Sequence, residues 1–258
     1  MTMQFEKINI EDIIDTAKEA GKAIMEIYQK DFTVEYKEDS SPLTEADKKA
    51  NEIICESLEK LYPNIPILSE ENKEVSYEIR KNWEYYWCID PIDGTKEFIK
   101  KNGEFTINIA LIHKDTPVLG VVYAPVLEDM YIAKKGFGAY KNNKKLPLHV
   151  NNNPKEKMSV VASKSHLSFE TQEFIDNLDT KEVEQVSKGS SLKLCMVAEG
   201  SADIYPRLAP TMEWDTAASH AIVLESGKEV IQFKNDQAII YNKENLLNPW
   251  FVVKENYE

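Results

Sequence analysis

Two aspartates three positions apart, Asp90 and Asp93, stand in the stretch DPIDGT with a proline between them. On a continuous helix this spacing would place both carboxylates on one face, but Pro91 and Gly94 argue against a helix here. The preceding residues, YYWCI, are aromatic and β-branched, which indicates a buried strand. We therefore expect the two acids on a turn at the end of a strand, which is where α/β proteins place their ligands.

A second strand end carries another carboxylate. The apolar run IPIL is followed by Ser-Glu-Glu, so Glu70 leaves a short strand much as Asp90 does. Taken alone, Glu70 is more simply interpreted as a solvated loop residue, because exposed glutamates are the rule. Asp215 opens an apolar helix, where the simplest role is a cap on the free amide groups. Thr44 and Asp47 likewise fit a capping box at the start of another helix.

Taken together, the acids favour a metal site. A structural turn rarely needs two carboxylates directly after a buried strand, whereas Mg²⁺ prefers oxygen ligands and completes its shell with water and substrate phosphate. Such oxygens are available from Glu70, Asp90, the carbonyl of Ile92 and Asp93. Gly94 allows a backbone to approach an anion closely, and a helix that begins at Thr95 would direct its free amide groups to the same place. We therefore expect metal and phosphate to bind together.

The elements that must position these acids change in pattern along the chain. Apolar residues recur at helical spacing over 10–28 and 46–61, which predicts two N-terminal helices. From 65 to 135 the pattern is extended, which predicts helices stacked on a largely antiparallel sheet. After residue 151 a strand, a helix near 168–178, a strand near 183–187 and a further helix alternate. The predicted fold class is α/β, with an α+β N-terminal half and an α/β C-terminal half.

A polar break, NNNPKEK, begins at residue 151. It divides the chain into an N-terminal α+β sub-domain over 1–150, which carries most of the acids, and a C-terminal α/β sub-domain over 151–258. Because the break is too short to be a free linker, we expect the two sub-domains to pack as one domain over 1–258.

Composition limits the class of protein. The chain has 258 residues and is 42% hydrophobic, which is enough for a sizeable core. No apolar stretch reaches the ~18 residues of a transmembrane segment, and the first residues lack the layout of a signal peptide. These features predict a cytoplasmic protein, and they leave open its oligomeric state and a peripheral association with the inner face of the cell membrane. A net charge of −13 argues against a nucleic-acid polymer as partner, but not against a small anion.

The motif DPIDGT, with SEE upstream and WDTAA downstream, resembles the lithium-sensitive, magnesium-dependent phosphatase superfamily that includes the inositol monophosphatases. Longer stretches resemble the bacterial CysQ-type 3'(2'),5'-bisphosphate nucleotidases across nearly the whole chain. They are DPIDGTKEFIKKNGEFTINIALI, GVVYAPV, GSSLKLCMVAEG and YPR. Lys96-Glu97-Phe98 stands where inositol monophosphatases usually carry Thr-Asn-Phe, which favours the nucleotidases. The resemblance implies a layered αβαβα sandwich.

The resemblance also implies roles for individual residues. The ligands of Mg²⁺ would be Glu70, Asp90, the Ile92 carbonyl, Asp93 and Asp215. Thr95, oriented by Asp47, would help to take the proton of the attacking water, so these two are the implied catalytic residues. The implied substrate-binding residues are Gly94, Thr95, Ser163, His166, Ser190, Lys193, Arg207 and Asp215. We expect Ser190 also to cap the helix that follows it and Lys193 to face an anionic phosphate. For Arg207 an exposed surface position is an equally simple interpretation.

The implied reaction is magnesium-dependent hydrolysis of adenosine 3',5'-bisphosphate to AMP and phosphate, in sulfur assimilation, with 3'-phosphoadenylyl sulfate as a second substrate. A small-molecule bisphosphate nucleotide is thus the expected partner. Two alternatives stay open: an inositol monophosphatase of the same superfamily, and a non-catalytic regulator that binds nucleotide or metal. The presence of both Thr95 and Asp47 disfavours the regulator.

Overall fold

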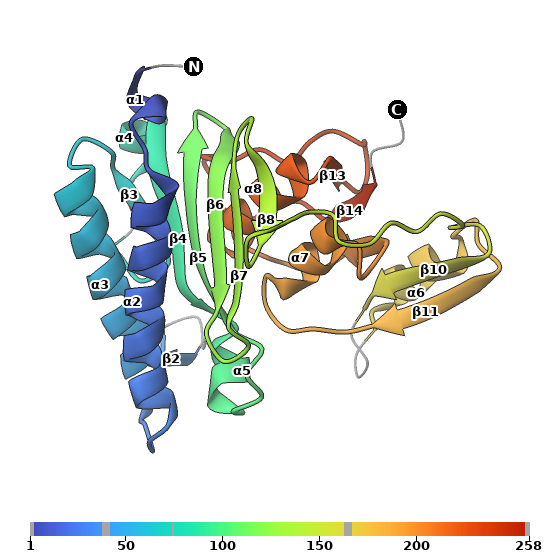
Figure 1. Ribbon diagram of the computed structural model, residues 1–258, viewed down its shortest axis with the longest axis horizontal. Helices are drawn as coiled ribbons and strands as arrows, with labels where there is room; N and C mark the ends of the chain where they lie inside the picture. Colours follow the sequence, from blue (N-terminus) through green and yellow to red (C-terminus); the bar gives the residue numbers. More distant parts are fainter. Residues whose placement is uncertain (1–2, 38–41, 74, 163–166, 256–258) are drawn as a thin grey trace.

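The computed structural model describes residues 3–37, 42–73, 75–162 and 167–255. In this part of the chain, the main elements form five layers in the order helices, sheet, helices, sheet, helix (Figure 1). This is the αβαβα sandwich that the family resemblance implies, and the predicted α/β fold class is confirmed. Among the described residues no helix is both long enough and apolar enough to cross a membrane.

The first layer consists of two helices that cover one face of the larger sheet (Figure 1). They are α2 (Ile10–Tyr28) and α3 (Glu45–Leu61), which confirms the two predicted N-terminal helices. On α2 the buried side chains include Ile13, Ala17 and Ile24, whose spacing gives one apolar stripe toward the sheet. Asn9 caps this helix, because its side chain accepts a hydrogen bond from the Glu11 amide at 3.3 Å.

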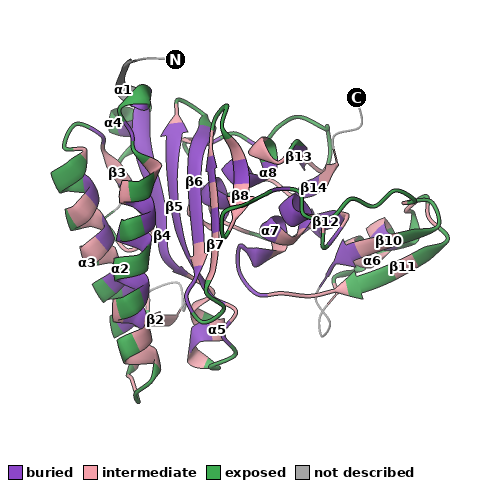
Figure 2. Cartoon of the chain, viewed as in Figure 1, coloured by how far each residue is buried: buried purple, intermediate pink, exposed green. Residues whose placement is uncertain are grey.

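The second layer is a seven-stranded sheet in the order β3-β4-β5-β6-β7-β8-β9. Its strands are β3 (Ile67–Ser69), β4 (Tyr85–Asp93), β5 (Thr106–His113), β6 (Thr116–Ala124), β7 (Asp129–Lys134), β8 (Gly138–Lys141) and β9 (Lys144–Lys145). Only the pair β3–β4 is parallel, which agrees with the predicted largely antiparallel sheet. Strands β4 and β5 are buried almost throughout, since helices cover both faces of the sheet (Figure 2).

The third layer consists of α7 (Leu192–Glu199) and α8 (Glu213–Glu225), which lie between the two sheets (Figure 1). Helix α8 crosses β4, β5 and β6. It approaches β6 so closely at Gly120 that a Cβ atom there would collide with the main-chain carbonyl of Ala218. Glycine at this position therefore permits the packing of the helix on the sheet.

The fourth layer is a five-stranded sheet in the order β11-β10-β12-β14-β13, and the fifth is α6 (Phe169–Asp176). The strands are β10 (Lys157–Val161), β11 (Glu182–Val186), β12 (Ile204–Arg207), β13 (Lys228–Gln232) and β14 (Phe251–Glu255). Strand β10 is parallel to β11 and β12, whereas β14 is antiparallel to β12 and β13. The predicted strand, helix and strand after residue 151 correspond to β10, α6 and β11, but β12, β13 and β14 were not predicted.

The remaining elements are short: α1 (Met3–Glu6), β1 (Val34–Tyr36), β2 (Pro42–Thr44), α4 (Tyr77–Arg80) and α5 (Thr95–Ile99). One buried hydrophobic cluster includes residues of both sheets and of the helices between them, among them Cys88, Cys195, Ala218 and Phe251. The division of the chain into sub-domains at residue 151 stays a prediction.

Candidate active site

Two neighbouring parallel strands end at the same edge of the larger sheet, and a carboxylate stands at each end. β3 pairs with β4 in the register Ser69 to Ile89, and the amide of Glu70 donates a hydrogen bond to the Ile89 carbonyl at 3.2 Å. The next residue on β4 is Asp90. The structure therefore brings Glu70 and Asp90 side by side, as expected from the two strand ends.

The stretch from Asp90 to Asp93 contains a β-bulge. Asp90 pairs with Asn108 of β5 and Asp93 with Thr106, so three steps along β4 oppose two along β5. Gly94 follows with a φ of +91°, a conformation that favours glycine. The chain then turns into α5, which begins at Thr95. The prediction of a buried strand is confirmed, but the prediction that the two acids lie on a turn is wrong, because β4 continues through Asp90 and Asp93 and the turn follows at Gly94.

The third acid, Asp215, lies in the first turn of α8. This helix begins at Glu213 rather than at Asp215, and the Asp215 carboxylate caps it by accepting a hydrogen bond from the Met212 amide at 2.9 Å. Glu70, Asp90 and Asp215 each place one carboxylate oxygen so that all three atoms lie within 4.8 Å of one another. We call these three residues the carboxylate cluster.

The carboxylate cluster fits a hard divalent cation, because all its donor atoms are oxygens and no histidine or cysteine takes part. Asp90 is only 1% exposed, and its carboxylate accepts a hydrogen bond from the Ile92 amide at 3.1 Å. A buried carboxylate this close to two others is favourable only when a proton or a cation offsets its charge.

The pKa shifts of the three acids also indicate that the cluster favours a bound positive charge. Burial raises the pKa of both Glu70 and Asp90, and the charges of neighbouring acids raise the pKa of Asp90 further. Burial and then the charge of Asp93 raise the pKa of Asp215 to about 8, although the Met212 amide and Arg207 oppose the shift. A bound cation would favour the ionised form of each acid and reverse these shifts.

Asp93 lies at the edge of the carboxylate cluster. Its Oδ2 accepts a hydrogen bond from Ser191 Oγ at 2.6 Å and another from Asn108 Nδ2 at 3.4 Å. Among the described residues, Asp93 is not part of the group whose oxygens meet within 4.8 Å. Its charge nevertheless raises the pKa of each member of the cluster.

Thr95 and Asp47, the two predicted catalytic residues, are in contact although 48 positions separate them. Thr95 Oγ1 lies 3.3 Å from Asp47 Oδ1 and 3.3 Å from the Ile92 carbonyl oxygen, and it can donate to either. Asp47 Oδ2 accepts hydrogen bonds from the Thr44 amide at 2.7 Å and from Thr44 Oγ1 at 2.6 Å, which confirms the predicted capping box. Burial raises the pKa of Asp47, and the bonds from Thr44 oppose this shift.

Lys37 belongs to the site but was not predicted from the sequence. Its Nζ donates hydrogen bonds to Glu70 Oε1 at 2.8 Å and to Glu71 Oε1 at 2.6 Å. This ammonium offsets part of the negative charge of Glu70. The contact joins the segment after β1 to the end of β3, and a lysine in a polar stretch gives no sequence signal of such a partner.

The surface next to the carboxylate cluster is hollowed into two adjoining cavities. The small cavity, about 70 Å³, is lined in part by Asp93 and Asp215, and the larger, about 380 Å³, extends from it past α7 to the start of α6. Lys193, Tyr205 and Arg207 line both. The buried Nε of Arg207 has no hydrogen-bond partner among the described residues. Two cationic side chains beside the acids can bind an anionic ligand.

Most of the predicted substrate-binding residues come together here. Ser190, Lys193, Arg207 and Asp215 line the small cavity. Gly94 lies next to Ser190, and Thr95 Oγ1 contacts the Ile92 carbonyl. Ser163 and His166 lie outside the described residues. Arg207 is half-buried and lines both cavities, and its role in substrate binding stays a prediction.

The prediction that Ser190 caps α7 is wrong. The N-cap residue of α7 is Ser191, and its side chain makes no capping hydrogen bond. Ser190 has a φ of +47°, and its Oγ lies 3.2 Å from Thr106 Oγ1. The Ser190 hydroxyl therefore contacts the start of β5 in the larger sheet instead of the free amides of α7.

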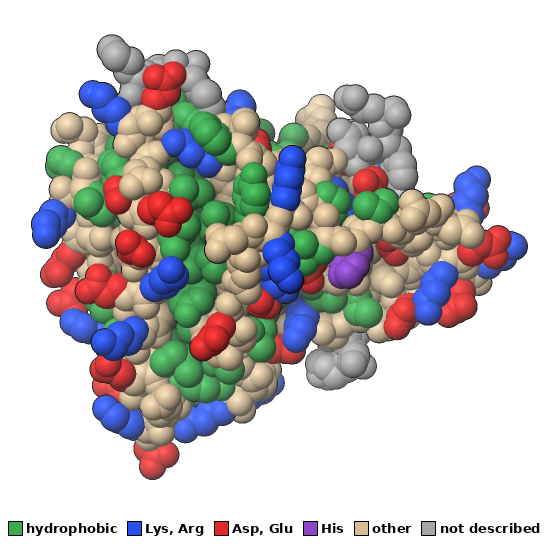
Figure 3. Space-filling view, in the orientation of Figure 1, with side chains coloured by type: hydrophobic (Ala, Val, Ile, Leu, Met, Phe, Trp, Pro, Cys, Tyr) green, Lys and Arg blue, Asp and Glu red, His purple; other side chains and the backbone are tan. Residues whose placement is uncertain are grey.

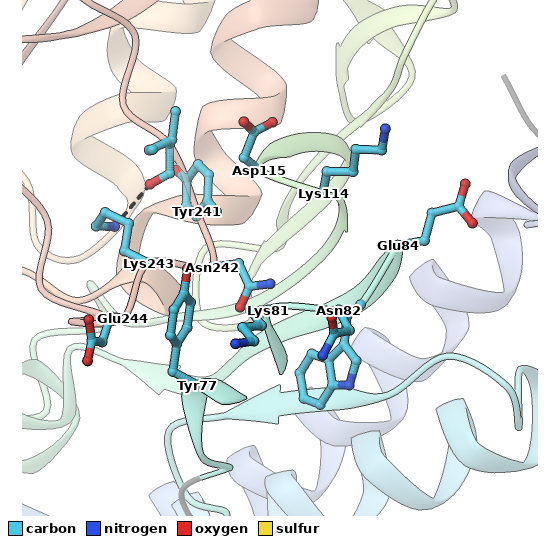
Figure 4. A pocket seen from close by; sticks show the side chains of 12 residues that line it. Tyr77, Lys81, Asn82, Glu84, Lys114, Asp115, Tyr241, Asn242, Lys243 and Glu244 are labelled. Atoms are coloured by element: carbon cyan, nitrogen blue, oxygen red, sulfur yellow. Dashed lines mark hydrogen bonds between the residues drawn. The ribbon is translucent and has the colours of Figure 1, made fainter. Parts of the chain in front are cut away.

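A larger cavity, about 650 Å³, lies at the opposite end of β4, where Trp83 and Glu84 precede the strand (Figure 4). The charged side chains that line it are Lys81, Lys114 and Lys243 together with Glu84, Asp115 and Glu244, so the two signs balance. No group of acids meets there as the carboxylate cluster does, within the described ranges. We therefore assign the active site to the carboxylate cluster and the two smaller cavities, although the cavity of about 650 Å³ is larger than either of them.

Comparison with known proteins decides the family. The sequence model of the inositol monophosphatase family matches residues 8–256. The chain belongs to the inositol monophosphatase family. Within it, the 3'(2'),5'-bisphosphate nucleotidase CysQ of Salmonella typhimurium is 46% identical to this chain over 246 residues, which cover 95% of this chain and 98% of the relative.

Solved structures of the inositol monophosphatase family have the same fold as this chain. The crystal structure of CysQ from Bacteroides thetaiotaomicron has a TM-score of 0.86 and 45% sequence identity, and the match covers 96% of this chain and 97% of that one. The IMPase of Thermotoga maritima has a TM-score of 0.75 and 26% identity, over 95% of this chain and 91% of that one. This member of the inositol monophosphatase family is thus more similar to these two CysQ proteins than to that IMPase, which confirms the predicted resemblance.

Proposed function

We propose that the protein is a Mg²⁺-dependent phosphatase that hydrolyses the 3'-phosphate of adenosine 3',5'-bisphosphate to give AMP and phosphate. The observation that carries this proposal is that Lys193 and Arg207 stand between the carboxylate cluster and the cavity of about 380 Å³. A bisphosphate nucleotide can place its 3'-phosphate at the cluster, its second phosphate against the two cationic groups and its adenosine in the cavity. The similarity to the CysQ nucleotidases supports the same substrate class.

3'-Phosphoadenylyl sulfate carries the same 3'-phosphate, and we include it as a second substrate. Both nucleotides belong to sulfur metabolism. In this proposal Gly94 lets the scissile phosphate approach the backbone, and Ser190, Ser163 and His166 complete the substrate contacts.

The proposed metal ligands are Glu70, Asp90, the Ile92 carbonyl, Asp93 and Asp215. Their oxygen-only donor set suits Mg²⁺ better than a softer metal. Mg²⁺ bound there would supply positive charge to the phosphate oxygens and polarise the attacking water. The residues of the chain supply the geometry, because two strand ends and one helix hold the acids on a fixed scaffold.

Thr95 and Asp47 would take the proton of the attacking water. In this step Thr95 Oγ1 accepts the water proton while its own hydrogen passes to Asp47 Oδ1, 3.3 Å away. Thr44 holds the other oxygen of Asp47, and burial raises the pKa of Asp47, which makes it a stronger base. The water oxygen bonds to phosphorus as the bond between phosphorus and the 3'-oxygen breaks, and a proton from solvent completes the hydroxyl of AMP.

An inositol monophosphate would use less of this site. It carries one phosphate and no base, so it would leave the cavity of about 380 Å³ largely empty and would offer Lys193 and Arg207 no second anion. The site therefore favours the nucleotide over the inositol ester, and Thr95 and Asp47 favour an enzyme over a regulator.

The surface favours a small molecule over a nucleic-acid polymer. On the face shown in Figure 3, Lys and Arg side chains are interspersed with Asp and Glu side chains and form no continuous basic field. The net charge of −13 would repel an extended polyanion. Positive charge is needed only locally, at the cluster and at the two cationic side chains beside it.

A phosphate-release assay over a small substrate panel tests the proposal. The panel consists of adenosine 3',5'-bisphosphate, 3'-phosphoadenylyl sulfate, AMP and inositol-1-phosphate, each with Mg²⁺ and with EDTA. We expect kcat/KM for adenosine 3',5'-bisphosphate to exceed that for inositol-1-phosphate at least about tenfold. The reason is that a charge-assisted contact to the second phosphate, which inositol-1-phosphate lacks, changes the efficiency by about this factor. Equal efficiencies, or a preference for inositol-1-phosphate, would overturn the substrate assignment, and turnover in EDTA would overturn the metal.

A further inference from the structure

The segment that leads into α7, residues 188–191, is joined to the chain around the start of β5. Four contacts connect the two segments: Lys188 Nζ to Glu104 Oε1 at 3.3 Å, the Gly189 amide to Glu104 Oε2 at 2.8 Å, Ser190 Oγ to Thr106 Oγ1 at 3.2 Å, and Asn108 Nδ2 to Ser191 Oγ at 2.7 Å. Segment 188–191 precedes a helix that packs against the five-stranded sheet, whereas β5 belongs to the seven-stranded sheet. The contacts therefore join the two sheets beside the active site.

Unlike the other three residues of its segment, Ser191 also contacts two of the proposed metal ligands, Asp93 and Asp215. Ser191 Oγ lies 2.6 Å from Asp93 Oδ2 and 2.7 Å from the main-chain carbonyl oxygen of Asp215. With the bond from Asn108, one oxygen atom contacts β4, β5 and α8 at once. Ser191 and Asn108 are each only 1% exposed, so water does not compete for these bonds.

This use of the hydroxyl is not what the position of the serine in the helix would require. Ser191 is the N-cap residue of α7, yet its side chain does not cap that helix. A hydroxyl has one hydrogen and can donate to only one acceptor at a time, while the Asn108 amide occupies one of its lone pairs. The oxygen is thus fixed between an acid of β4 and the first turn of the helix that carries Asp215.

We propose that Ser191 is a positioning residue of the metal site. Its hydroxyl, itself held by Asn108, sets the place of Asp93 relative to the first turn of α8, and so aligns the acids of β4 and α8 for one divalent cation. The inference deepens the proposed function and rests on it only for the binding of that cation. Loss of a hydrogen-bond partner behind a metal ligand typically weakens metal binding about ten- to hundredfold.

The test measures cation binding directly, without nucleotide. Metal-free protein is titrated with Mn²⁺, a cation that shares the preference of Mg²⁺ for oxygen ligands, and free Mn²⁺ is measured by electron paramagnetic resonance. Ser191→Ala should raise the Mn²⁺ dissociation constant about ten- to hundredfold. Ser191→Thr restores a hydroxyl and should recover most of the affinity. In the phosphatase assay Ser191→Ala should lower kcat and leave KM for the nucleotide nearly unchanged.

Ser219→Ala is the matched control. Ser219 is also a fully buried serine, but among the described residues its hydroxyl bonds only within α8, to the Thr216 carbonyl at 3.1 Å. This variant should bind Mn²⁺ as wild type does. Asn108→Ala completes a double-mutant cycle with Ser191→Ala: if Asn108 acts through Ser191, the double variant should bind Mn²⁺ no more weakly than Ser191→Ala.

A dissociation constant of Ser191→Ala within about twofold of wild type overturns the proposal, because a partner that aligns the ligands changes affinity about tenfold or more. Equal weakening in Ser191→Ala and Ser219→Ala also overturns it, since that result would reflect general loosening of the core. If Ser191→Ala does not fold, Ser191→Cys, whose thiol is only a weak hydrogen-bond donor, decides by the same measurement. The titration needs no turnover, so a protein that proves inactive on bisphosphate nucleotides fails the proposed function without deciding the role of Ser191.

Discussion

Replacement of Asp215 with asparagine should stabilise the metal-free protein while it removes most of the phosphatase activity. The Asn side chain keeps the volume and an oxygen that can accept the Met212 amide, but it lacks the charge. Burial and the charge of Asp93 raise the pKa of Asp215 from its ordinary value of 3.8 to about 8. At pH 7 the folded protein therefore holds a proton on this acid that the unfolded chain does not hold.

The sign of the effect follows from this difference. Because the folded state binds the proton more tightly, the stability due to Asp215 is fully present below the unfolded pKa and is lost as the pH rises toward about 8. One proton changes the free energy of unfolding by about 1.4 kcal/mol per pH unit in this range. Asp215→Asn lacks this titration, so it should be more stable than wild type by about 4 kcal/mol at pH 7 and by less than half as much at pH 5.

Urea unfolding in EDTA at pH 5 and pH 7, followed by tryptophan fluorescence, measures this difference. With Mg²⁺ at about 100 times its dissociation constant, wild type should gain about 2.7 kcal/mol, and the variant much less. Asp179→Asn is the control, because that side chain is 93% exposed and lies outside the site. The reasoning is refuted if Asp215→Asn is no more stable than wild type in EDTA at pH 7, or if its advantage does not shrink at pH 5.

Three further predictions concern the metal, the substrate and a buried histidine. Excess chelator should abolish phosphate release and added Mg²⁺ should restore it, while a titration with Li⁺ should inhibit by competition at a magnesium position; unchanged rates would contradict both. Lys193→Ala should lower kcat/KM on adenosine 3',5'-bisphosphate about ten- to hundredfold, the worth of a charge-assisted contact of ~1.5–3 kcal/mol, and barely change hydrolysis of inositol-1-phosphate; equal losses would indicate a general defect. Burial lowers the pKa of His220 to about 3, so the stability it allows is present above its ordinary pKa of 6.5 and is lost as the pH falls toward 3. His220→Gln should remove this loss, and its free energy of unfolding relative to wild type should therefore rise by about 2 kcal/mol between pH 7 and pH 5 in urea unfolding; a constant difference would exclude the titration.

The local part of the site could be predicted from the sequence. The buried strand, the proline between two acids and the glycine after them are neighbours in the chain, and each restricts the backbone on its own. The structure turns them into β4, a bulge and the positive φ of Gly94. The two N-terminal helices were predicted almost to the residue for the same reason, because their apolar stripes are encoded within one segment.

The non-local part could not be predicted. Ser191 contacts Asp93 over 98 positions of sequence, and Lys37 contacts Glu70 over 33. A serine before a helix usually caps it, and a lysine in a polar stretch is usually solvated, so the common interpretations hide both contacts. β13 and β14 were missed because a strand of five residues gives little pattern, and their pairing depends on chain segments that meet only in the folded protein.

The carboxylate cluster needs a scaffold that resists its own repulsion, and the first turn of α8 shows how this is achieved. Glu213, which is 0% exposed, accepts hydrogen bonds from the Asn242 amide at 2.7 Å, the Lys243 amide at 3.1 Å and Lys243 Nζ at 2.6 Å. The buried guanidinium of Arg80 holds the same loop through Asn242 Oδ1 at 3.0 Å. With Ser191 on the Asp215 carbonyl, the turn is fixed from two sides. The position of Asp215 therefore depends on satisfied buried groups around it, and the metal-free protein can hold acids together that would otherwise move apart.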